Sequence, residues 1–313
     1  MSTRDAPGLR LVRHGYPTIP AGREQIERTA TAATLRTRPL ARPALVGDAL
    51  DGSDHRHRTA MFLDVLDGDA VAGLRERARR ELLDLTGRRW AEGETRGAFD
   101  LLVEAYGIAA LDWAGIDLGR ADAIRLSHRL AAIVDGFGLA GTADPRAWSA
   151  RWRMNRWGRG QVRRARRHPE KVPAGPLRAI AAATDRDGAP LDQTVAAIEL
   201  LNVLRPAVAA AYLGAFALLA LHQHPHWQDR LAPAEASELR TSFAHEVRRT
   251  APPVPALAGR LVDHGRRCPG EPTTVALLEA TLEVFSGLAW HAVGEGHDPA
   301  PIPARERLRL VQA

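Results

Sequence analysis

The sequence contains a single cysteine, Cys268, among 313 residues. A disulfide framework is therefore excluded, as is a zinc or iron–sulfur site with several thiolate ligands, and this cysteine usage is typical of a reducing cytoplasm. Tyrosine and phenylalanine are scarce, with 3 and 6 residues, whereas alanine, leucine and arginine are abundant. Since that composition favours helix over strand, we expect a mainly α-helical fold with little β-sheet.

Long hydrophobic runs are also lacking. The longest, 207–221, has 15 residues and is rich in alanine, so it predicts a buried helix and no membrane span. The first residues have no apolar core of the kind found in a signal peptide, and we expect a cytoplasmic protein. The net charge of +6 comes from arginine and by itself identifies no partner.

Hydrophobic content of 45% is enough for one large domain, and we treat 1–313 as a single domain with an irregular segment at 1–45. A helix is expected to start near Ser53 or Asp54, either of which can cap it, and 171–190 is expected to be a connection. Apolar spacing predicts further helices over 71–90, 97–113, 120–138, 191–223, 236–250 and 275–289.

The cysteine lies in an unusual local setting. Arg266 and Arg267 precede Cys268, Pro269 and Gly270 follow it, and an apolar stripe of helical spacing then begins. A position beside fixed positive charges and before a helix N-terminus favours the thiolate over the thiol. Such a thiolate is a nucleophile or a metal ligand, and one sulfur is enough to bind haem iron.

The run from Arg267 to Glu271 resembles the haem-thiolate loop of cytochrome P450 enzymes. A second run, Asn202 to Pro206, resembles the distal helix of their bacterial fatty-acid peroxygenase branch, in which an Arg-Pro pair replaces the usual acid–alcohol pair. The resemblance implies a truncated P450-like helical fold that binds haem b through Cys268. It also implies hydrogen peroxide as oxidant and a carboxylic acid as substrate.

Arg205 breaks the charge pattern of its helix. It is the only charged residue between Glu199 and His222, and Pro206, which follows it, removes a backbone donor and is expected to break or kink the helix. A buried arginine needs an anion. Two explanations stay open: an ion pair with a carboxylate of the protein or a haem propionate, or an anion site for a substrate carboxylate, which the guanidinium fork suits.

Other positions carry roles that the resemblance implies. His55 and Arg58 match the helix that holds the haem propionates, and Arg266 and Gly270 belong to the cofactor-binding loop. Asp48 and Asn202 match the distal side of the haem. The pair Glu246 and Arg249 matches the family's Glu-x-x-Arg motif, and the three-residue spacing also places the two side chains on one helical face.

The chain departs from the family in two places. The N-terminal sheet section and the segment between the Glu-x-x-Arg helix and the cysteine loop are both shortened, and we predict a homo-oligomer in which a second copy covers the apolar surface left behind. No aromatic residue lies between Thr250 and Val284. We therefore expect a shorter, bulkier or more polar acid than a long-chain fatty acid.

Other interpretations remain. His55 and His57 are two apart, share no helical face, and are not expected to bind a metal. The Arg- and Trp-rich stretch 145–168 is typical either of nucleic-acid binding or of a solvated helix face with inward tryptophans; we favour the second and expect no nucleic-acid partner. Alternative functions are a haem-thiolate enzyme of a biosynthetic pathway with a non-fatty-acid substrate, and a degenerate haem-free scaffold.

Overall fold

The computed structural model describes residues 52–135, 145–250, 270–293, 297–298, 305–306 and 308–312. The expected irregular segment 1–45 lies outside the described residues, as do Asp48, Arg266 and Cys268, so the roles predicted for them stay predictions.

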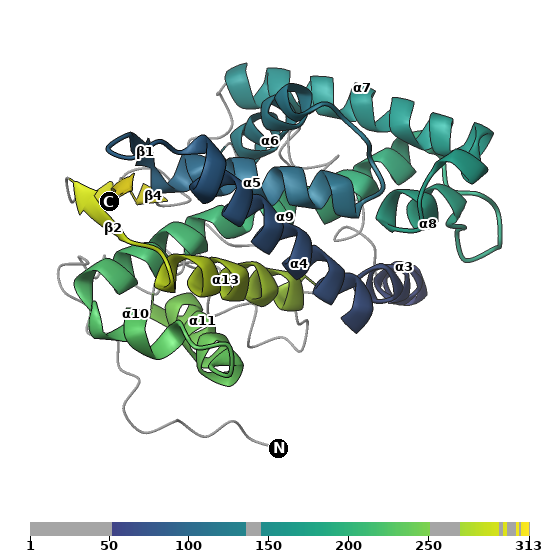
Figure 1. The fold of residues 1–313 in the computed structure, drawn as a ribbon. Coiled ribbons are helices and arrows are strands. Elements are labelled where there is room, and N and C mark those ends of the chain that lie inside the picture. Colours follow the sequence, from purple (N-terminus) through teal and green to yellow (C-terminus); the bar gives the residue numbers. More distant parts are fainter. Residues whose placement is uncertain are drawn as a thin grey trace, which may run out of the picture.

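The described chain is mainly helical, as predicted (Figure 1). Its longer helices are α3 (Gly52–Val65), α4 (Gly68–Asp84), α5 (Ala98–Trp113), α6 (Arg120–Asp135), α7 (Pro145–Arg167), α9 (Gln193–Gln223), α11 (Ser237–Thr250) and α13 (Glu271–Ser286). The shorter ones are α8 (Pro176–Ala182), α10 (His226–Leu231), the π-helical turn η2 (Leu85–Arg89) and the 3-10 turn η3 (Pro169–Lys171).

The fold is built around α9. This helix contacts α5, α6, α7, α8, α11 and α13, and Figure 1 shows α7 on one side of it and α10 and α11 on the other. Asp192 caps its first turn by accepting the backbone N–H groups of Thr194 and Val195. Among the described helices α9 is the one long and apolar enough to cross a membrane, but 72% of its most apolar window is buried inside the fold. It is the core helix that the sequence predicted.

Pro206 does not end this helix. The α-helix runs without interruption from Gln193 to Gln223, so the expected break at Pro206 was wrong. Proline removes one backbone donor, which leaves the carbonyl of Asn202 without its helical partner. Val203, Leu204, Ala207 and Val208 on either side of the proline are all buried. Packing of these neighbours holds the helical backbone where its own hydrogen bond is missing.

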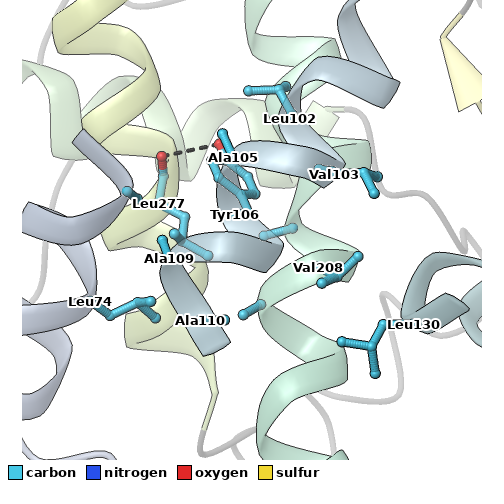
Figure 2. Packing of buried hydrophobic residues seen from close by; sticks show 14 of the residues in the cluster. Leu74, Leu102, Val103, Ala105, Tyr106, Ala109, Ala110, Leu130, Val208 and Leu277 are labelled. Carbon is cyan, nitrogen blue, oxygen red and sulfur yellow. Dashed lines mark hydrogen bonds between the residues drawn. The ribbon is translucent and has the colours of Figure 1, made fainter. Parts of the chain in front are cut away.

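Close approach of α5 to α9 organises the centre of the core (Figure 2). The buried Tyr106 hydroxyl donates to the carbonyl of Leu277 at 3.1 Å and lies 2.5 Å from the Thr281 hydroxyl. Burial raises the pKa of Tyr106. Gly214 lies against this group, and a Cβ there would meet Leu102 at 2.7 Å and the Tyr106 hydroxyl at 2.9 Å. The glycine is therefore required by packing.

The strands form two small antiparallel sheets at one end of the helical body, as Figure 1 shows. One sheet has the order β1-β5-β2, formed by β1 (Thr95–Gly97), β5 (Arg309–Gln312) and β2 (Trp290–Val293). The other pairs β3 (His297–Asp298) with β4 (Arg305–Glu306). The central strand places Leu310 in the core, where it is fully buried. The prediction of a mainly α fold with little sheet is confirmed.

Several element boundaries differ from the expectations. Helix α3 begins at Gly52, so Ser53 and Asp54 lie inside its first turn. The helix predicted over 71–90 starts earlier and continues as the π-helical turn η2. Helix α8 interrupts the expected connection 171–190, because Pro176 occupies the first helical position, where its missing N–H is not needed.

Candidate functional site

A chain of polar side chains crosses the apolar surface of α9. The Nδ2 of Asn202 donates to Glu199 Oε2 at 2.9 Å, and Arg205 Nη2 donates to Asn202 Oδ1 at 3.1 Å. From α3, Arg58 Nη1 lies 3.5 Å from Glu199 Oε1. Steps of three residues place the three side chains of α9 on one face. The amide of Asn202 therefore connects a carboxylate to the guanidinium of Arg205 and orients it.

The charges in this chain are largely removed from water. Glu199 is fully buried and Arg58 is 8% exposed, whereas Arg205 is half-buried. Removing one partner of a buried pair leaves the other charge uncompensated, which costs ~3–5 kcal/mol. The ion pair of Glu199 and Arg58 therefore links α3 to α9, and the carboxylate of Glu199 balances the positive charge of Arg58. The half-buried Arg205 is the end of the chain that faces a cavity.

That cavity lies where α6, α7 and α9 meet. Its volume is about 10 Å³, room for about one water molecule. Burial lowers the pKa of Arg151, which lines it from α7. The complete lining combines apolar side chains with two arginines and two asparagines: Leu130, Ile133, Arg151, Asn155, Ile198, Leu201, Asn202 and Arg205. This wall offers both an apolar surface and donors for an anion.

The basic stretch 145–168 forms α7, and its two described tryptophans lie on different faces. Trp157 is half-buried and packs on the core, as expected for an inward tryptophan. Trp152 is 62% exposed, so the expectation that it turns inward was wrong. The inner face of α7 is formed by residues near Ala150 and Met154, and position 152 lies on the opposite side of the helix.

The propionate-binding positions are only partly described. His55 lies in α3, but its side chain is outside the described part of the structure. Arg58, one turn further along α3, is buried, and its Nη1 makes no hydrogen bond. This nitrogen pairs with Glu199 Oε1 at 3.5 Å without a hydrogen bond, and a propionate oxygen would supply one. This observation fits haem binding at that position.

The cysteine loop leads directly into a helix, as the sequence indicated. Gly270 is the N-cap residue of α13, and its carbonyl accepts the Thr273 hydroxyl at 2.6 Å. Arg248 of α11 donates to Glu271 Oε1 at 2.8 Å and fixes the start of α13 to α11. Cys268 is two residues before this anchored N-cap. Its contacts are not described, and its role as haem ligand stays a prediction.

The Glu-x-x-Arg pair forms on α11. Arg249 donates from Nε to Glu246 Oε2 at 2.7 Å and from Nη2 to Oε1 at 2.6 Å. The two-pronged geometry confirms that these side chains share one helical face and interact. Glu246 is mostly buried and Arg249 is 68% exposed.

Sequence reasoning missed two residues of the site. Glu199 was treated as the boundary of an apolar run, although its spacing of three from Asn202 and six from Arg205 could have indicated a shared face. Arg151 was one arginine among nine in Pro145–Arg167, and only the packing of α7 against α9 distinguishes it from the exposed ones.

No protein-family model matches the sequence. The structure is similar to cytochrome P450SP alpha in complex with (R)-ibuprophen, with a TM-score of 0.72 and 24% identity, over 85% of this chain and 80% of that chain. It is also similar to ligand-free cytochrome P450 OleT, with a TM-score of 0.75 and 20% identity, over 86% and 82% of the two chains. A variant of OleT in complex with arachidonic acid matches with a TM-score of 0.75 and 20% identity, over 86% and 81%. The chain has the cytochrome P450 fold, as predicted.

Proposed function

We propose that this protein is a haem-thiolate enzyme that uses hydrogen peroxide to oxidise a carboxylic acid, by hydroxylation or by oxidative decarboxylation. The observation that carries the proposal is Arg205, a half-buried arginine that Asn202 orients toward a water-sized cavity between α6, α7 and the core helix α9 of a P450 fold. Two of the similar structures hold carboxylic acids, (R)-ibuprophen and arachidonic acid. That likeness supports an acid as the substrate class.

Haem b bound through the Cys268 thiolate would supply the iron centre at which peroxide is activated, and electron donation by the sulfur favours O–O cleavage. Arg58 is the described residue that fits this group, because its buried Nη1 pairs with Glu199 but makes no hydrogen bond. His55, Arg266 and Gly270 would complete the cofactor site. Asp48 would face its distal side.

Arg205 would bind the substrate carboxylate through its guanidinium fork. Its hydrogen bond to Asn202 fixes the plane of the fork, and Glu199 holds Asn202 in turn. A carboxylate fixed in this way can take up and return the proton of peroxide, a function for which the described cavity wall offers neither histidine nor carboxylic acid. Ile198 and Leu201 make the same wall partly apolar.

A second candidate is a haem-thiolate enzyme of a biosynthetic pathway acting on a compact polar acid. The observation that favours it is the composition of the cavity wall, in which Arg151 and Asn155 add polar groups to Asn202 and Arg205. A short acid with further oxygen atoms could accept hydrogen bonds from these groups, whereas the hydrocarbon part of a fatty acid could not. A haem-free scaffold is the outcome if the purified chain holds no haem.

Arg205→Ala tests the first proposal. Loss of hydrogen bonds to a charged group costs ~1.5–3 kcal/mol, so the variant should bind carboxylic acids about 10- to 100-fold more weakly. Titration of a series of acids against the haem absorbance spectrum measures this affinity. Peroxide-dependent turnover should fall in parallel, and a small added carboxylate should restore part of it on neutral molecules.

Arg164→Ala provides the control, because it removes an arginine from the exposed face of α7, away from the cavity. Its acid affinity should equal that of the parent protein. Equal affinity of Arg205→Ala and the parent for acids would remove Arg205 from the mechanism. Affinity that rises steadily with acyl length would favour a fatty acid over a compact polar acid.

A further inference from the structure

Helix α7 has an unusual excess of positive charge. Pro145–Arg167 contains nine arginines and no aspartate or glutamate, which exceeds the net charge of +6 for the whole chain. Among the described residues, no carboxylate forms an ion pair with Arg156, Arg159 or Arg163. This part of the surface is therefore positively charged and not neutralised from within the described fold.

Three of these arginines line one groove. The groove has a volume of about 240 Å³ and is formed by Arg156, Arg159, Gly160, Arg163 and Gln193. Spacings of three and four residues place the three guanidinium groups on one face of the helix, over a length of about 10 Å. Gln193, at the start of α9, closes the groove from the other side and donates from Nε2 to the carbonyl of Arg159 at 2.9 Å.

The acid next to Gln193 is already used. Asp192 precedes Gln193, and its carboxylate accepts the backbone N–H groups of Thr194 and Val195 at the start of α9. These hydrogen bonds lower the pKa of Asp192, so it stays ionised as a cap. It forms no ion pair with the three arginines of the groove in the described structure, and the groove keeps its positive charge.

Gly160 keeps the floor of the groove open. Glycine is a poor helix former, and α7 contains two. At Gly158 a Cβ would touch Ala197 at 3.4 Å, so close packing against α9 accounts for that glycine. At Gly160 a Cβ would meet nothing within 4 Å, and its φ lies outside the positive range that favours glycine. Neither packing nor backbone geometry requires a glycine at this position.

We propose that this groove binds a compact anion bearing phosphate groups, of the size of a diphosphate. Its volume is many times the ~10–15 Å³ that holds one water molecule, and more than one inorganic phosphate fills. Guanidinium forks bind phosphate oxygens in pairs, and several forks along one line match several phosphate groups. The site is separate from the cavity at Arg205 and independent of the function proposed for it.

A concave site favours a small anion over a membrane or a nucleic acid. A membrane surface meets protruding apolar side chains, and the groove lining contains none. Single-stranded nucleic acid needs aromatic faces on which bases stack, and no aromatic residue lines the groove. The exposed Trp152 lies beyond it, with its ring 6.0 Å from the Arg156 guanidinium carbon.

The test is calorimetric titration of the full-length protein with sodium pyrophosphate at low ionic strength. Arg159→Gln should weaken binding at least about tenfold, because it removes one of the charge-assisted contacts. Gly160→Glu should abolish binding, since it fills the groove and adds a negative charge. Glutamate is a better helix former than glycine, so this variant should retain the fold, which circular dichroism verifies.

Arg153→Gln is the matched control, because it removes the same charge from an exposed position of α7 that does not line the groove. It should leave pyrophosphate affinity within about twofold of the parent value. Equal losses in Arg153→Gln and Arg159→Gln would mean diffuse attraction to a basic helix and would overturn the proposal.

Two further titrations separate the sources of phosphate. Vesicles of phosphatidylglycerol and a single-stranded RNA oligonucleotide are compared with pyrophosphate under the same conditions, with phosphatidylcholine vesicles as the neutral reference. We expect pyrophosphate to bind the parent protein, to bind Arg159→Gln more weakly and not to bind Gly160→Glu. Binding of vesicles or RNA without any binding of pyrophosphate would contradict a small-anion site.

Discussion

Helices α4 and α7 both carry rows of arginines, but they differ in what these arginines contact. All four arginines of α4 pair with carboxylates, which come from α4 itself, α5 and α13. These arginines are Arg75, Arg77, Arg79 and Arg80. The described arginines that line the groove on α7 have no such partner. Their helix is held against α9 by an apolar face that includes Ala150, Met154 and Val162.

The difference separates two uses of one residue type. On α4, Arg75 and Arg79 share Glu283 at 2.5 and 2.6 Å, so the charge contributes to the packing of α4 on α13. On α7, Arg166 donates to the carbonyls of Ala181 and Leu191 at 2.9 and 2.7 Å, whereas the charge of the three groove arginines remains available to a ligand. Arg205 stands between these cases, because it is oriented inside the fold but faces a cavity. A row of positive charges alone therefore does not identify a binding site. The groups that each arginine already contacts must be known as well.

The largest effect expected from this comparison concerns the two tryptophans of α7. Trp157 packs on the core, and Trp157→Ala should lower the free energy of unfolding by ~2–4 kcal/mol, less than for a fully buried aromatic residue. Trp152 lies on the exposed face, and Trp152→Ala should change the free energy of unfolding by less than ~0.5 kcal/mol. Urea unfolding measures both. A larger loss for Trp152 would show that the outer face of α7 also stabilises the fold.

A smaller effect is expected on α4. Glu283→Ala removes the carboxylate shared by Arg75 and Arg79 and should lower the free energy of unfolding by ~1–2 kcal/mol. The loss is smaller than for a fully buried ion pair because all three side chains are partly exposed. Glu76→Ala is the control, since Glu76 is about half exposed and pairs more distantly with Arg79 and Arg80. That variant should lose no more than ~0.5 kcal/mol.

The pH dependence of unfolding provides a second readout of the same pair. Partial burial opposes ionisation of Glu283, but the hydrogen bond from Arg79 and the charges of both arginines outweigh it and lower its pKa below 4.5. The contribution of ionised Glu283 to the free energy of unfolding is therefore fully present above pH 4.5 and is lost as pH falls through the folded-state pKa of this carboxyl. Glu283→Gln should flatten this acid limb. An unchanged limb would mean that the pair does not stabilise the fold.

Much of the fold could be predicted from the sequence because its helices are strongly periodic. The range predicted for α9 began two residues before Gln193 and ended at the same residue, and α5 differed by one residue. Helix α8 was missed because Gly175 and Pro176 are typical of turns as well as of helix starts. Pro206 was misjudged because packing, which the local sequence does not express, holds the helix through it.

The candidate site was predictable in its motifs but not in its contacts. Arg205 and Asn202 could be identified from an isolated charge and a resemblance, and Glu246 and Arg249 from their spacing. That Glu199 joins Asn202 to Arg58 depends on how α3 packs against α9, and a sequence pattern does not give that placement. The groove on α7 likewise appears only once α9 contributes Gln193.

The most direct test of the account is the absorbance spectrum of the purified, reduced protein with carbon monoxide. A haem held by the Cys268 thiolate predicts a thiolate-type carbon monoxide band in the parent protein and its loss in Cys268→Ala. Arg164→Ala, on the exposed face of α7, should keep the band. A parent protein without this band, or a Cys268→Ala variant that retains it, would contradict the haem-thiolate assignment.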